Sequence, residues 1–201
     1  MTDAHLGRLV AASLHQAIGE ELPQRLDFYE HWLHSEGLRD GSIGFSPMLA
    51  VLGFLRTEGL DVHDRVVERA GQLSAEWSLM SLTPFRRRFI GWMPGPIRVR
   101  AVLRLAGHIS LAADNRNTWR IRTKGRAARI ELASSVFCSV RGLQASPLCG
   151  FYRSLAVTTL AHFGLAPVVR VDSCRAMGAS ACVISITLGA VEPVRASAAA
   201  A

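Results

Sequence analysis

The chain has 201 residues, of which 49% are hydrophobic, and its 23 basic and 16 acidic residues give a net charge of +7. This size predicts a single domain with a proper hydrophobic core. No apolar run reaches the ~18 residues of a membrane-spanning helix, and the N-terminus lacks the layout of a signal peptide. We therefore expect a cytoplasmic protein whose four cysteines are reduced thiols or metal ligands rather than disulfides.

The first half of the chain is predicted to be helical, because apolar residues recur at helical spacing. Asp3 and Asp61 are expected to cap two of these helices, and Thr83-Pro84 and Ser46-Pro47 to begin two others. Residues 37–44 are expected to form a loop. The predicted helices cover residues 4–21, 23–33, 46–57, 61–82, 84–92 and 97–112.

The second half changes to strand patterns. Strands are predicted at residues 118–123, 127–132 and 135–140, then a helix after Cys149, a strand that ends at Cys174 and a strand that begins at Cys182. Helices followed by antiparallel strands indicate an α+β fold, with an N-terminal helical layer packed on a C-terminal sheet that carries one inserted helix. We expect one domain over residues 1–190 and a flexible tail over residues 191–201.

The charge is divided unevenly along the chain. Residues 1–85 have a net charge of −6, whereas residues 86–131 have a net charge of +10. Such asymmetry is compatible with an anionic partner, with an acidic layer docked on a basic one, or with a dimer built in that way. No helix-turn-helix or zinc-finger spacing accompanies it, which argues against nucleic acid. The basic residues that would hold an anionic partner are Arg86, Arg87, Arg88, Arg98, Arg100 and Arg104.

Three cysteines stand at the ends of predicted elements: Cys149 before a helix, Cys174 after a strand and Cys182 at the start of the next strand. A structural zinc site needs four ligands, and Asp172, His162, Cys138 or water could complete the set. His162 is disfavoured, because 13 helical residues separate it from Cys149 by about 20 Å. The alternative is a group of buried thiols without metal.

These residues resemble the 4-vinyl reductase-like family of bacteriochlorophyll-synthesis proteins and aromatic-responsive sensors. Cys149-Gly150 matches the family's helix start, and Cys174 and Cys182 match its closing cysteine pair. The family's glutamate ligand falls at Val171, with Asp172 one position away, on the opposite face of a strand. Its absence favours the reading without metal. The resemblance covers roughly residues 117–188 and implies an α+β fold shared with TRAPP vesicle-tethering subunits and haem-based NO sensors.

The resemblance also implies a homodimer formed through the helical layer and a pocket between helices and sheet. Such a pocket would hold a small apolar molecule, haem or another tetrapyrrole. Trp77, Trp92, His108 and Tyr152 are the residues we expect to line it. No phosphate loop, dinucleotide fingerprint or GxSxG motif is present, so no enzymatic activity is carried over. A ligand-binding sensor or carrier is the leading function. The alternatives are an accessory factor or enzyme of tetrapyrrole synthesis, and an adaptor with a basic surface.

Overall fold

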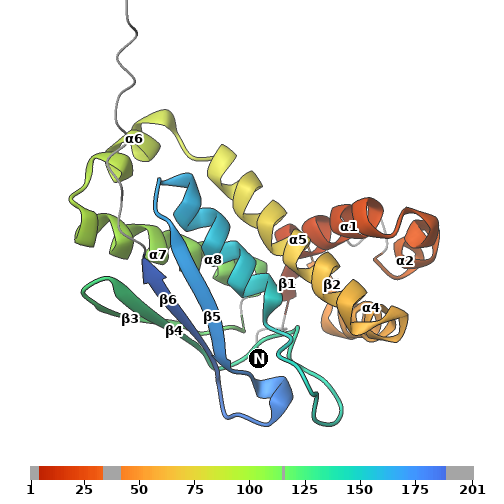
Figure 1. The fold of residues 1–201 in the computed structure, drawn as a ribbon. Coiled ribbons are helices and arrows are strands. Elements are labelled where there is room, and N and C mark those ends of the chain that lie inside the picture. The colour runs from red at the N-terminus through yellow and green to blue at the C-terminus, as the bar shows by residue number, and fades with distance from the viewer. Residues whose placement is uncertain (1–4, 34–41, 115, 189–201) are drawn as a thin grey trace, which may run out of the picture.

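A computed structural model describes residues 5–33, 42–114 and 116–188 and shows a helical half packed on a sheet (Figure 1). The helical half consists of β1 (His5–Gly7), α1 (Arg8–Glu21), the 3-10 turn η1 (Pro23–Arg25), α2 (Leu26–Leu33), β2 (Ser42–Gly44), α4 (Phe45–Glu58), α5 (Leu60–Met80), α6 (Pro84–Trp92) and α7 (Gly95–Ala113). The second half consists of β3 (Trp119–Lys124), β4 (Ala127–Leu132), α8 (Gly150–His162), β5 (Pro167–Ser173), the 3-10 turn η2 (Arg175–Met177) and β6 (Cys182–Leu188).

The four-stranded sheet has the order β3-β4-β6-β5, and every neighbouring pair is antiparallel. The predicted α+β class is therefore confirmed, and α8 is the helix inserted between β4 and β5. One row of side chains across the sheet is apolar: Ile121, Ile130, Ile184 and Val171 lie in register. The neighbouring row consists of Arg122, Arg129, Ser185 and Arg170. Period-2 alternation thus gives the sheet one face for the core and one polar face.

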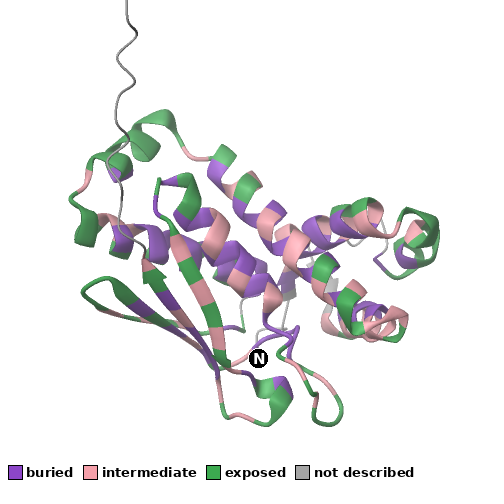
Figure 2. Ribbon diagram, viewed as in Figure 1, coloured by how far each residue is buried: buried purple, intermediate pink, exposed green. Residues whose placement is uncertain are grey.

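The core is continuous from the helical layer to the sheet. In Figure 2 many buried positions lie on α5 and on the helices α1 and α8 that pack against it. α8 contacts both α5 and β5, so it lies between the helical layer and the sheet. Gly71 of α5 permits a close approach to α8, because a Cβ atom there would lie 2.3 Å from the carbonyl oxygen of Phe151.

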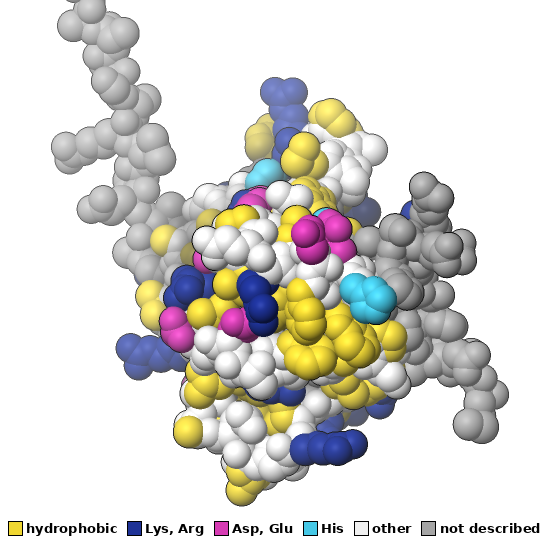
Figure 3. Space-filling model, turned by 90° about the vertical axis from the view of Figure 1, so that its right-hand side faces the viewer, with side chains coloured by type: hydrophobic (Ala, Val, Ile, Leu, Met, Phe, Trp, Pro, Cys, Tyr) yellow, Lys and Arg dark blue, Asp and Glu magenta, His cyan; other side chains and the backbone are white. Residues whose placement is uncertain are grey.

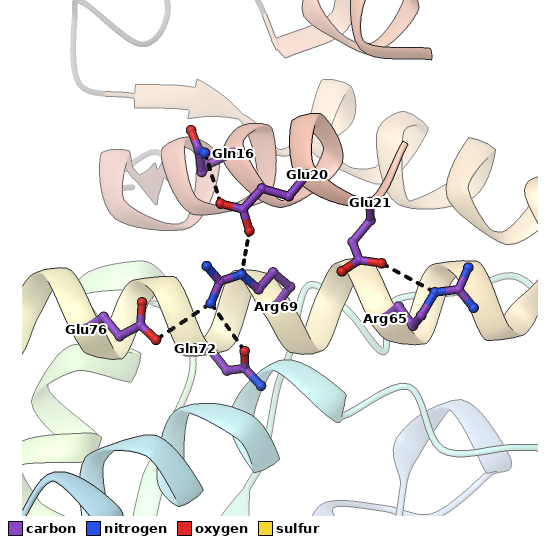
Figure 4. Close-up of polar contacts among 7 residues, drawn as sticks. All are labelled: Gln16, Glu20, Glu21, Arg65, Arg69, Gln72 and Glu76. Atoms are coloured by element: carbon purple, nitrogen blue, oxygen red, sulfur yellow. Dashed lines mark hydrogen bonds and ion pairs between the residues drawn. The ribbon is translucent and has the colours of Figure 1, made fainter. Parts of the chain in front are cut away.

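A polar network fastens α1 to α5 (Figure 4). The guanidinium of Arg69 lies 2.5 Å from the Glu20 carboxylate and 3.6 Å from that of Glu76, and Arg65 lies 3.4 Å from Glu21. The hydrogen bond from Arg69 lowers the pKa of Glu20 below its ordinary value of 4.5. These acidic residues are thus paired with arginines of their own helical half.

Replacing Glu20 by Gln should lower the free energy of unfolding at pH 7 by less than about 1 kcal/mol, because the pair is partly exposed and screened by solvent. A lowered folded-state pKa contributes stability that is present above pH 4.5 and is lost as the pH falls through the lowered pKa. The unfolding free energies of wild type and variant, measured in urea, should therefore converge in acid. A difference that persists in acid would contradict this account. The matched control is Asp27→Asn, because Asp27 is exposed on α2 and has no ion-pair partner among the described residues.

Several boundaries differ from the predictions. Residues 5–7 and 42–44 form β1 and β2, which pair through Leu6 and Ile43, instead of a helix start and a loop. Gly59, and not Asp61, occupies the N-cap of α5, and Asp61 lies in the first turn, paired with Arg65. Residues 135–140 form an irregular turn rather than a strand.

The remaining predictions concern the helix caps, the loop, the tail and membrane spans. Asp3, most of the predicted 37–44 loop and the tail lie outside the described residues. The cap at Thr83 is confirmed, because its hydroxyl accepts from the Arg86 amide. No helix among the described residues is long and apolar enough to cross a bilayer.

Candidate metal centre

Four buried cysteines from three parts of the fold lie together at the N-terminal end of α8. Cys138 lies in the turn after β4, Cys149 at the N-cap of α8, Cys174 directly after β5, and Cys182 at the start of β6. All four are free thiols, and none is more than 8% exposed. The polypeptide therefore directs its whole cysteine complement to one place.

The spacing of the sulfur atoms matches a tetrahedral metal site. Sγ of Cys149 lies 3.0 Å from that of Cys174 and 3.4 Å from that of Cys138. Sγ of Cys182 lies 3.5 Å from Cys138 and 4.0 Å from Cys174, and all four ligand atoms lie within 4.8 Å of one another. A tetrahedron with Zn–S bonds of about 2.3 Å has sulfur separations of about 3.8 Å. The group therefore has the number, chemistry and size of a closed zinc site with four cysteine ligands.

The structure brings three of the four predicted metal residues together and leaves the fourth apart. Cys149, Cys174 and Cys182 belong to the cluster, whereas Asp172 lies on the polar sheet face and accepts a hydrogen bond from the Ser185 hydroxyl. A register shift does occur in β5 between Val171 and Ser173, but it leaves Asp172 exposed.

Cys138 takes the position that the sequence left open. A strand over residues 135–140 would not direct it to the cluster, but the turn there does so. His162 ends α8 at the opposite end from Cys149 and is exposed. The structure therefore supplies a fourth sulfur from Cys138, one of the candidates that the sequence left open.

The four thiols lie close enough to change one another's pKa. The hydrogen bond with Cys138 and that with Cys149 lower the pKa of Cys174, whereas contacts with Cys138 and burial raise the pKa of Cys149. As zinc ligands all four sulfurs would be thiolates, and their negative charge would lie where almost no water reaches it. Buried negative charge is costly unless a cation compensates for it, and a metal ion provides that compensation.

Asp114 holds the turn that carries Cys138. Its buried carboxylate accepts hydrogen bonds from the Arg116 amide at 3.1 Å, the Val136 amide at 3.1 Å and the Tyr152 hydroxyl at 3.4 Å. Burial raises the pKa of Tyr152, so this phenol remains a donor. Ser135 then accepts from the Cys138 amide. A carboxylate at the end of α7 thus fixes the fourth sulfur.

Replacing Asp114 by Ala should leave the Val136 amide and the Tyr152 hydroxyl without their acceptor, at a cost of about 1–3 kcal/mol for each group that stays dry. The loosened turn should weaken zinc binding roughly tenfold or more, as loss of outer-shell support does. Competition against a chromogenic chelator measures this. Asp172→Ala is the matched control, and equal zinc affinities in the two variants would contradict the role of Asp114.

Of the four predicted ligand-lining residues, only Trp92 lines one of the hollows of about 460 and 480 Å³ that the described residues form. Tyr152 is fully buried against Phe137 and Phe151, Trp77 is half-buried against the core, His108 is exposed on α7, and Trp92 is 92% exposed on α6.

Among the histidines with described side chains, His63 is buried. Its Nδ1 lies 3.1 Å from Asp64, and burial lowers its pKa. Haem needs an axial ligand beside an apolar cavity. His108 does not line either of the hollows of about 460 and 480 Å³ that the described residues form.

A hollow of about 460 Å³ does lie between the helical layer and the sheet. Asp64 and Glu68 of α5 line one side, Gly150 and Arg153 of α8 line another, and Val169, Arg170 and Val171 of β5 complete it together with Pro147. Glu68 and Arg153 form an ion pair across it. The volume of the hollow exceeds the ~300 Å³ of small ligand sites. The hollow also adjoins the cysteine cluster in the chain, because its lining residue Gly150 directly follows Cys149.

Comparison with solved structures places the fold. An H-NOX protein mutant from K. algicida, in its unliganded Fe(II) state, has a TM-score of 0.64 at 15% identity, over 92% of this chain and 97% of that chain. The Fe(II)NO form of an H-NOX protein from S. oneidensis has a TM-score of 0.57 at 13% identity, over 92% and 99%.

The phenol-responsive sensory domain of the activator PoxR has a TM-score of 0.47 at 15% identity, over 73% of this chain and 75% of that chain. This likeness is too weak to carry an argument. No family model and no curated protein sequence matches the chain. At these identities the H-NOX likeness establishes the fold, and the predicted architecture shared with NO sensors agrees with it.

Proposed function

We propose that the protein is a ligand-binding sensor or carrier module whose α+β fold is stabilised by a structural zinc ion. The observation that carries the proposal is the set of four buried sulfur atoms within 4.8 Å of one another. Cys138, Cys149, Cys174 and Cys182 would hold the ion as thiolates and would join the β4 turn, α8 and the β5–β6 connection. In such a closed site zinc has a structural role, because no coordination position remains for a substrate.

The ligand would occupy the hollow between α5, α8 and β5. Its lining offers carboxylates from Asp64 and Glu68 and guanidiniums from Arg153 and Arg170, so it suits a small molecule that carries charge. This differs from the small hydrophobic or tetrapyrrole-like ligand expected from the family resemblance. The H-NOX structures are described with Fe(II) and NO, but the exposure of His108 gives no support to haem in this chain.

Metal and ligand analysis of the purified protein tests the proposal. Elemental analysis should give one zinc per chain, and native mass spectrometry or an absorption scan should detect any retained ligand. Thermal-shift screening of the zinc-loaded protein should identify small charged ligands whose stabilisation disappears in Glu68→Ala but persists in Glu76→Ala, a matched change on the same helix. No zinc, or ligands that bind both variants equally, would contradict the two parts of the proposal separately.

A second copy of the chain would bind at α2 and α4. On that face hydrophobic side chains gather at the surface (Figure 3). The rings of Phe28 and Trp32 contact Phe54 with centroids 5.1 and 5.4 Å apart, and Phe28 and Trp32 stay 39% and 37% exposed. We assign the homodimer implied by the family resemblance to this aromatic cluster. Trp32→Glu should then shift light scattering from dimer to monomer, and an unchanged mass would exclude this surface.

A further inference from the structure

We propose that α6 is a membrane-surface anchor that binds the chain to anionic phospholipid bilayers. The observation is a short helix that presents three exposed aromatic side chains next to exposed arginines. Of the nine residues of α6, Ile90 alone is buried, and Figure 2 shows the helix exposed along its length at the edge of the molecule. The inference stands apart from the zinc site and the ligand hollow.

The aromatic side chains form one face. Phe85, Phe89 and Trp92 follow the i, i+4, i+7 spacing of a single helix face, and they are 80%, 56% and 92% exposed. The rings of Phe85 and Phe89 stack with centroids 6.3 Å apart. Together with Arg88 these residues line an open hollow of about 480 Å³. Met80, the last residue of α5, and Ile97, in the first turn of α7, are also exposed, at 76% and 58%.

The charge around this face has one sign. Residues 77–113 contain six arginines and no Asp or Glu. Arg87 donates to the Leu79 carbonyl and Arg98 to the Gly91 carbonyl, so these two fix α6 to its neighbours. Arg86 and Arg88 are exposed and have no ion-pair partner among the described residues. A partner for this surface must therefore be anionic as well as apolar.

The helix is also held in a fixed pose. Thr83 caps its N-terminus, Pro84 occupies its first turn, and Pro94 stands at the N-cap of α7 directly beyond its end. Because proline fixes φ, the aromatic face is presented without a flexible connection. Binding through this face therefore costs little conformational entropy, which favours reversible binding to a surface.

Among anionic partners, a lipid bilayer fits best. Phe and Trp on one face of a short helix, with Arg beside them, is typical of helices that lie in the membrane interface, where Trp is enriched. A symmetric contact between two copies through this patch would bring the same arginines together, because such interfaces pair identical surfaces. Juxtaposed like charges disfavour that arrangement.

Vesicle sedimentation of the full, zinc-loaded chain tests the proposal. The protein should bind phosphatidylcholine vesicles that contain phosphatidylserine about tenfold or more tightly than phosphatidylcholine alone, and added salt should weaken the binding, since each basic residue near an anionic surface contributes to it. Phe85→Ser with Phe89→Ser, and separately Arg86→Glu with Arg88→Glu, should each reduce binding about tenfold or more.

The matched control is Arg120→Glu with Arg122→Glu, which makes the same charge change on the polar face of β3. It should keep vesicle affinity within about threefold of wild type, and zinc content and melting temperature confirm that every variant folds. Absence of binding to the anionic vesicles, or equal losses in the α6 and β3 charge variants, would overturn the anchor. So would a patch that instead mediates self-association or binds an oligonucleotide in preference to lipid.

Discussion

Cys138→Ser should release the metal and remove most of the folding stability of the domain. Structural zinc contributes on the order of 10 kcal/mol of apparent free energy to small zinc domains, which is comparable with the whole stability of an ordinary domain. Even a loss of about 5 kcal/mol lowers the melting temperature of a chain of this size by roughly 10–20 °C. Cys149→Ser should have the same effect, because both sulfurs belong to one closed set.

The experiment combines elemental analysis with calorimetry, with and without a zinc chelator. Asp172→Asn is the decisive control, because it removes the alternative fourth ligand and should leave zinc content and melting unchanged. Loss of zinc in Asp172→Asn but not in Cys138→Ser would reverse the assignment. If the cysteines are only buried thiols, each serine should cost about 1–3 kcal/mol and the chelator should have no effect.

The cysteine cluster shows what sequence could and could not reveal about the site. Cys149, Cys174 and Cys182 were identifiable because each flanks an element with clear periodicity. Cys138 was only one of several candidates, because its place depends on a turn held by Asp114, Val136 and Tyr152 through tertiary hydrogen bonds. The sequence of residues 135–140 resembles a strand, but these residues pair with none of the strands that the structure describes.

The fold was predictable where local and tertiary preferences agree. The strands around the Lys124-Gly125-Arg126 turn, the α8 insertion and the β5–β6 pair follow from alternation and turn residues. β1 and β2 were not predictable, because residues 5–7 continue the helical pattern of α1 and their strand form depends on pairing with a distant segment. The ligand-lining choices depended on aromatic character alone, which does not distinguish a buried Tyr152 from an exposed Trp92.

Gly71→Ala should destabilise the protein by about 3 kcal/mol or more, despite the higher helix propensity of alanine, which by itself favours the variant by about 1 kcal/mol. The new Cβ atom would lie 2.2 Å from the Ser154 hydroxyl and 2.3 Å from the Phe151 carbonyl oxygen. The serine can rotate, but the carbonyl belongs to the backbone of α8, so the two helices must separate. Urea unfolding measures the loss.

Gly53→Ala is the matched control, because Gly53 lies in the middle of α4 and its nearest neighbour to an added Cβ is the Arg56 side chain at 3.8 Å. That variant should gain up to about 1 kcal/mol from helix propensity. Since Cys149 is the N-cap residue of α8, Gly71→Ala should also weaken zinc binding, whereas Gly53→Ala should not. A Gly71→Ala protein that melts at or above the wild-type temperature would show that α5 and α8 are not packed this closely.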